Sequence, residues 1–175
     1  MASDRHIEDP ETVEGLRAML EVLALQPTRL TEAVRLLFMP YPDFGGVVYE
    51  VVAARADGDR AATGPMLVGA DAPAPLGRAL SEFAHENRIG LQCTRFHSEV
   101  SGADRTIVAS TTATVRWPLS PADELDLVAY AETSDLEALA MSLVPLQHLL
   151  CSEVVLELLL HDNPTHTSSR NPAAG

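Results

Sequence analysis

The segment that decides the fold is Thr106-Ile-Val-Ala-Ser-Thr-Thr-Ala-Thr-Val-Arg-Trp117, in which apolar and polar side chains alternate. Alternation of this kind in β-branched residues is typical of a strand with one buried face. Pro118 and Pro121 interrupt the pattern, because proline has no N–H to donate to a neighbouring strand. Residues 125–132 then alternate again. The two segments therefore predict an antiparallel hairpin within residues 106–132.

The apolar sides of the two segments predict how the strands pair. The expected apolar pairs are Trp117–Leu125, Val115–Leu127 and Ala113–Ala129. The same register gives the polar pairs Arg116–Asp126 and Thr112–Tyr130, both favourable across a sheet. A slip of one residue would turn every apolar side chain of one strand to the wrong face.

The composition describes one acidic globular domain. The chain has 175 residues, of which 46% are hydrophobic and 21% charged, and its net charge is −13. This charge argues against nucleic acid and against an anionic membrane as partners, because both select basic surfaces. All twelve basic residues are arginine, which excludes a lysine Schiff base and the lysine of a phosphate-binding loop.

The cysteines and the chain start predict a cytoplasmic protein. Cys93 and Cys151 are the only cysteines. A single disulfide is open to them, but we interpret them as small, buried, reduced side chains. The polar start of the chain has no apolar signal region. No run approaches the roughly 18 apolar residues that suggest a membrane-spanning helix.

Local signals predict the remaining elements. Asp9-Pro10-Glu11 is a good helix start, and Pro27 ends that helix. Spacing of apolar residues predicts further helices over residues 28–39, 76–87 and 134–160, of which the last should be kinked or divided at Pro145. Residues 146–160 also fit a strand, although we favour the helix. Further strands are predicted at residues 47–56, 65–68 and 91–100.

The expected fold is therefore α+β, with an antiparallel sheet of about five strands in a ββ-α-βββ order and helices at both ends. Residues 1–9 are expected to be a flexible segment, residues 10–160 a single domain and residues 161–175 a disordered tail. This order of elements resembles that of PAS, GAF and roadblock-type domains. The resemblance lies in predicted topology alone, and shared topology does not fix an activity.

The sequence lacks the common catalytic and cofactor motifs. It contains no G-x-G-x-x-G, phosphate-binding loop, H-E-x-x-H, C-x-x-C or G-x-S-x-G. His161 and His166 flank Asn163-Pro164, but the local sequence supplies no third metal ligand. We therefore predict no cofactor, no metal and no catalytic residue.

One face of the predicted sheet is the candidate site. Continuing the pairing through the turn at residues 101–104 places Cys93 opposite Thr112, Arg95 opposite Ser110 and His97 opposite Val108. The resulting cluster combines donors, acceptors and a histidine that can titrate near neutral pH. The candidate residues of this polar face are Arg95, His97, Thr112, Arg116, Asp126, Tyr130 and Glu132. The alternative is a solvated sheet face with balanced charges.

Three functions remain open. The preferred hypothesis is a non-enzymatic regulatory or adaptor module that binds a protein partner or forms a homodimer, because residues 146–160 are apolar around most of the helix. The second is a sensor that binds a small molecule between the sheet and a helix over residues 76–87. The third is a small enzyme that uses His97 with Glu132 or Asp126 for proton transfer.

Overall fold

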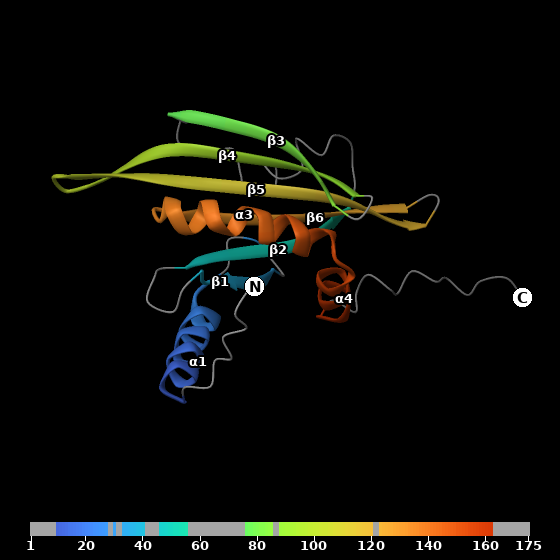
Figure 1. The fold of residues 1–175 in the computed structure, drawn as a ribbon, viewed down its shortest axis with the longest axis horizontal. Coiled ribbons are helices and arrows are strands. Elements are labelled where there is room, and N and C mark those ends of the chain that lie inside the picture. The colour runs from blue at the N-terminus through green and yellow to red at the C-terminus, as the bar shows by residue number, and fades with distance from the viewer. Residues whose placement is uncertain are drawn as a thin grey trace, which may run out of the picture.

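The computed structural model describes residues 10–27, 30, 33–40, 46–55, 76–85, 88–120 and 123–162 (Figure 1). Described elements, in chain order, are α1 (Pro10–Leu25), β1 (Val34–Phe38), β2 (Val47–Arg55), β3 (Gly77–His85), β4 (Arg88–Ser101), β5 (Asp104–Ser120), β6 (Asp123–Thr133), α3 (Leu136–Cys151) and α4 (Glu153–Asp162). The six strands form one antiparallel sheet in the order β1-β2-β6-β5-β4-β3. The prediction of an α+β fold with an antiparallel sheet is confirmed.

The central hairpin has the predicted register. Trp117 is paired with Leu125, and Arg116 with Asp126, and every other predicted pair of β5 and β6 is also found. On the other side of β5, Cys93 lies opposite Thr112 and His97 opposite Val108, again as expected. The alternation of side chains in residues 106–117 therefore predicted both the strands and their alignment.

Helix α3 covers the apolar face of this sheet. It lies across the middle strands in Figure 1, and its buried residues Leu139, Ser142, Leu146 and Leu150 recur at helical spacing. Against them pack the apolar side chains of β2, β5 and β6, among which Leu127 is fully buried. This layer of α3 and α4 on the sheet forms the main core of the described residues.

A buried hydrogen bond between β2 and α3 lies within this core. The Tyr49 hydroxyl lies 2.5 Å from Ser142 Oγ, and Ser142 Oγ donates to Leu139 O at 2.7 Å. Because the only hydroxyl proton of Ser142 is directed to Leu139, Tyr49 is the donor to Ser142. Burial raises the pKa of Tyr49 above its usual value, against a smaller opposing effect of the Ser142 hydrogen bond.

The C-terminus of α3 is fastened to the sheet. Trp117 Nε1 donates to Leu150 O at 3.0 Å, and Arg88 Nη1 donates to Cys151 O at 3.2 Å. The Arg88 guanidinium also lies 3.6 Å from the centre of the Trp117 ring. These donors satisfy carbonyl groups that the end of a helix leaves without intrahelical partners.

Residues 146–160 are mostly helical, as favoured, but the predicted break is in the wrong place. Pro145 lies inside α3, and the helix ends at Cys151, before Ser152. Proline has no N–H to donate to the carbonyl four residues earlier in the helix. Because Pro145 is exposed, water can satisfy that carbonyl instead. Helix α4 then continues to Asp162, two residues beyond the predicted end of the domain.

Two predicted helices are wrong, because both segments form strands. Residues 34–38 within the expected helix 28–39 pair with β2, and residues 77–85 within the expected helix 76–87 pair with β4 along their whole length. Backbone pairing in the sheet thus overrides the helical spacing of apolar residues. The Phe83 ring of β3 lies over Gly90 of β4, where a Cβ atom would be only 2.1 Å from the ring.

These corrections change the predicted topology. The sheet has six strands instead of about five, and β3 replaces the helix of the expected ββ-α-βββ order. The resemblance to PAS, GAF and roadblock-type domains depended on that helix, so it carries no further argument. Residues 1–9, the predicted strand 65–68 and residues 163–175 lie outside the described residues.

Helix α1 begins at Pro10, as predicted, and is attached at its C-terminus. Arg35 of β1 donates from Nη1 to Leu23 O and from Nη2 to Gln26 O, the second at 2.6 Å. Figure 1 shows α1 beyond the β1 edge of the sheet.

In the described part of the chain no single helix has the length and apolarity to cross a membrane, although α3 and α4, bent by 69°, meet those criteria as a pair.

Candidate functional site

All seven predicted site residues belong to the sheet face opposite α3, which we call the polar face. They come from β4, β5 and β6, and the observed pairing places Arg95 beside Ser110, Thr112 beside Tyr130, and Ser110 beside Glu132. The structure does not gather them into one cluster. Asp126 and Glu132 lie six residues apart on β6, which corresponds to about 20 Å along an extended strand.

Arg116 and Asp126 form one end of the polar face. Arg116 Nε donates to Asp126 Oδ1 at 2.8 Å and Nη2 donates to Asp126 Oδ2 at 3.0 Å, while Nη1 lies 3.6 Å from Glu124 Oε2. Asp126 is fully buried, so its charge depends on this two-point contact. The geometry assigns the pair to the stability of the sheet.

Thr112 and Arg95 occupy the middle of the polar face and its β3 side. Thr112 Oγ1 donates to Cys93 O at 3.4 Å. Arg95 lies directly opposite Arg78 of β3, whose Nε donates to Cys93 Sγ at 3.3 Å. Neither arginine makes an ion pair with a carboxylate in the described part of the chain. Two like charges therefore face each other across neighbouring strands.

His97 and Glu132 form the other end together with Glu99, which is not among the seven predicted residues. One ligand atom from each of the three side chains lies within 4.8 Å of the others, and His97 Nε2 is 3.6 Å from Glu99 Oε1. Tyr130 donates its hydroxyl proton to Glu132 Oε2 at 2.7 Å. Glu99 follows His97 by two residues. Because side chains two residues apart on a strand point to the same face, this spacing could have placed Glu99 beside His97 on the polar face.

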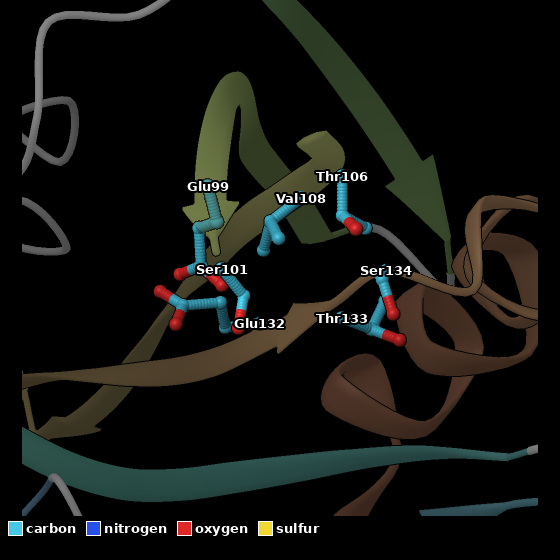
Figure 2. Close-up of a pocket in the computed structure, with 7 residues that line it drawn as sticks. All are labelled: Glu99, Ser101, Thr106, Val108, Glu132, Thr133 and Ser134. Carbon is cyan, nitrogen blue, oxygen red and sulfur yellow. The ribbon is translucent and has the colours of Figure 1, made fainter. Parts of the chain in front are cut away.

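Glu99 and Glu132 also line an open pocket (Figure 2). Its volume is about 520 Å³, and Glu99 and Glu132 extend toward each other at its wall. The remaining lining residues are Ser101, Thr106, Val108, Thr133 and Ser134. A second pocket of about 220 Å³ includes Glu132 and Tyr130 together with Arg35 and Glu50. Glu132 thus belongs to both pockets.

These positions test the geometry of two functional hypotheses. The small-molecule site between the sheet and a helix over residues 76–87 is wrong, because this segment is strand β3. His97 and Asp126 are eight residues apart in the β5 register, about 26 Å, which rules out direct proton transfer between them. His97 and Glu132 do approach each other.

Strand β3 presents a different kind of surface. Among the described strands it lies at the end of the sheet, and every residue from Gly77 to Glu82 is exposed. Its apolar residues are included: Leu76 just before the strand is 67% exposed and Leu80 is 53% exposed. An exposed end strand is a common site for pairing with another chain.

The apolar excess of residues 146–160 is partly explained by the fold. Leu146, Leu150, Val155 and Leu159 are buried against the sheet. The outer side of α3 and α4 nevertheless exposes Val144, Val154 and Leu158. This outer side is a second apolar surface.

Fold and surface together define an α+β protein whose antiparallel sheet has helices on one face and polar clusters on the other. No protein-family model, curated protein or solved structure matches the chain. Its function must therefore be argued from its own residues.

Proposed function

We propose that the protein is a non-enzymatic regulatory or adaptor module that acts as a homodimer, joined through strand β3 of each copy. The observation that carries the proposal is the exposure of this end strand on both of its sides. Pairing β3 with β3 of a second copy would continue the sheet across a two-fold axis. Such an interface uses the same surface of both copies and must therefore be self-complementary.

The sequence of β3 meets that requirement. When two antiparallel copies are aligned with Leu80 at the two-fold axis, Leu80 faces Leu80 and Leu76 faces Ala84. In the same alignment Arg78 of each copy faces Glu82 of the other. Apolar residues are thus matched with apolar residues and opposite charges with each other, which favours this register over its neighbours.

The charges of the isolated chain support the same arrangement. Arg78 and Arg95 lie opposite each other, without an ion pair to any described carboxylate. Glu82 of the second copy would approach this arginine pair. The rest of the chain is strongly acidic, with a net charge of −13, so an interface with local basic residues reduces the repulsion between two copies.

The outer side of α3 and α4 is the weaker candidate for self-association. It exposes Val144, Val154 and Leu158 but offers no arrangement that specifies which chain would cover it.

We keep the cytoplasm as the proposed location, because Cys93 and Cys151 are both free thiols in buried positions.

Light scattering on the full chain tests the dimer. At high micromolar concentration we expect the mass of two chains, and Arg78→Glu or Glu82→Arg should each shift the protein toward monomer. The double variant R78E/E82R restores opposite charges across the two-fold axis and should recover the dimer. A monomeric wild-type chain, or a double variant weaker than both single variants, would contradict the proposal.

Cysteine cross-linking tests the register. Leu80→Cys should form a disulfide between two copies, because directly opposed Cβ atoms lie about 4.5–5.5 Å apart. The Leu80→Cys variant is made in a Cys93→Ser background, because Cys93 lies opposite residue 80 in the sheet and would otherwise form an intramolecular disulfide with the new cysteine. Leu76→Cys is the matched control, because two such residues would lie about 26 Å apart. Equal cross-linking of both variants would rule out this register.

A further inference from the structure

We propose that His97, Glu99 and Glu132 form a binding site for a divalent transition-metal ion of the Zn²⁺ type. The site would use His97 Nε2 and one carboxylate oxygen from each glutamate. This inference is independent of the proposed dimer, because these residues lie on β4 and β6 and none belongs to β3.

The spacing of the three ligand atoms is close to what an ion requires. All three lie within 4.8 Å of one another, and the His97–Glu99 distance is 3.6 Å. Ligand atoms about 2.1 Å from a tetrahedral zinc ion are about 3.4 Å from each other. Glu99 is 59% exposed at its side chain, so it can rotate to close the remaining gap.

His97 supplies an independent indication of a ligand. Its side chain is only 8% exposed, and the Nε2 contact with Glu99 is longer than a hydrogen bond. Neither ring nitrogen has a hydrogen bond to another residue described in the structure. Imidazole is the commonest metal ligand among side chains, and the burial of the His97 ring holds it in place beside the two carboxylates.

Tyr130 prepares Glu132 for this role. The Tyr130 hydroxyl donates to Glu132 Oε2 at 2.7 Å, and Tyr130 is itself buried. A hydrogen bond of this kind fixes the orientation of a carboxylate that binds an ion. Tyr130 is therefore a positioning residue of the site.

The donor atoms favour zinc-like ions over calcium or magnesium. Imidazole nitrogen suits Zn²⁺ and related transition metals, whereas Ca²⁺ prefers six to eight oxygen ligands and Mg²⁺ an octahedron of oxygens and water. Three protein ligands leave a fourth position for water or a small anion. The 520 Å³ pocket, which Glu99 and Glu132 line, gives access to it.

Calorimetric titration of the full chain with Zn²⁺ tests the site. We expect one ion per chain in the micromolar range or tighter, with much weaker binding of Ca²⁺ and Mg²⁺. His97→Gln and Glu132→Gln should each weaken binding by at least tenfold, and Tyr130→Phe by about 10- to 100-fold. Unchanged affinity in the first two variants, or no zinc binding by the wild type, overturns the proposal.

Other histidines provide the matched control. His85 and His148 stack with ring centres 4.0 Å apart, and His161 and His166 occur near the C-terminus. The variant H148A/H166A should keep the wild-type zinc affinity. If this variant loses the ion while His97→Gln keeps it, zinc binds elsewhere and the proposal is wrong.

A measurement on the wild-type chain avoids dependence on variants that fold poorly. Co²⁺ in the site should produce the visible absorption of a four-coordinate ion and shift the ring proton resonances of His97 in NMR spectra. Paramagnetic shifts confined to His85, His148 or the terminal histidines would overturn the assignment.

Discussion

Strands β6 and β3 are similar in length and opposite in environment. β6 (Asp123–Thr133) is buried at every position from Leu125 to Ala131, whereas β3 (Gly77–His85) is exposed at its first six positions. β6 has a neighbouring strand on each edge, and α3 covers one of its faces. On the opposite face, Leu30 packs against Val128 and Tyr130. Position in the sheet thus separates a strand that is buried on both faces from one that is exposed on both.

The largest expected effect comes from removing an arginine beside β6. Arg116→Leu leaves Asp126 without its two-point partner while it stays fully buried. An uncompensated buried charge costs about 3–5 kcal/mol, and we expect the lower part of that range because Arg116 itself is partly exposed. Urea unfolding followed by circular dichroism would measure the loss.

The control for this experiment is Arg78→Leu on β3. At protein concentrations low enough to avoid association, its stability should stay within about 0.5 kcal/mol of the wild type, because Arg78 is on the exposed strand. Similar losses in the two arginine variants would remove the contrast between β6 and β3.

An identical truncation in both strands gives a difference of comparable size. Leu127→Ala should lower the free energy of unfolding by about 2–5 kcal/mol, because Leu127 is fully buried beneath α3. Leu80→Ala, at a 53% exposed position, should change it by less than about 0.5 kcal/mol. The pair can be measured by denaturant unfolding in dilute protein. A large loss for Leu80→Ala would mean that β3 is more buried than the structure shows.

A smaller effect is expected where β2 meets α3. Tyr49→Phe removes the hydrogen bond to Ser142, and Ser142 keeps its bond to Leu139 O. The expected loss at neutral pH is about 1 kcal/mol. Thermal unfolding at several pH values measures this loss and its pH dependence together.

The pH dependence follows from the raised pKa of Tyr49. The unfolded chain releases the phenol proton near pH 10, before the folded chain does. The stability contributed by Tyr49 is therefore complete below about pH 10 and falls as the pH rises toward the folded pKa. Tyr49→Phe should lack this part of the alkaline decline. An identical decline in both proteins would contradict the assignment.

The central part of the sheet could be predicted from sequence because its signal is long and has only one consistent register. Alternation over residues 106–117 fixed which side chains share a face, and this placed Arg116 with Asp126 and His97 on the polar face. These are properties of an extended chain with a period of two residues. The candidate face followed from them.

The edges of the sheet could not be predicted in the same way. Leu76, Ala79, Leu80 and Phe83 have helical spacing, yet the segment pairs with β4. The spacing of apolar residues within one segment gives no information about contacts between strands. The contact of the Phe83 ring with Gly90 is of this kind, because it forms only when both strands are in place. Glu99 was within reach of sequence reasoning, because it shares the polar face with His97. The grouping of side chains into separate clusters required the structure.

Trp117 has a practical consequence, because it is the only tryptophan in the chain. Its indole N–H is bonded to Leu150 O at the end of α3, its ring lies beneath the Arg88 guanidinium, and it is 3% exposed. Separation of α3 from the sheet would expose the indole to water. The intrinsic fluorescence of the protein should therefore be a single-site optical reporter of helix docking, with an emission shift to longer wavelength when α3 detaches.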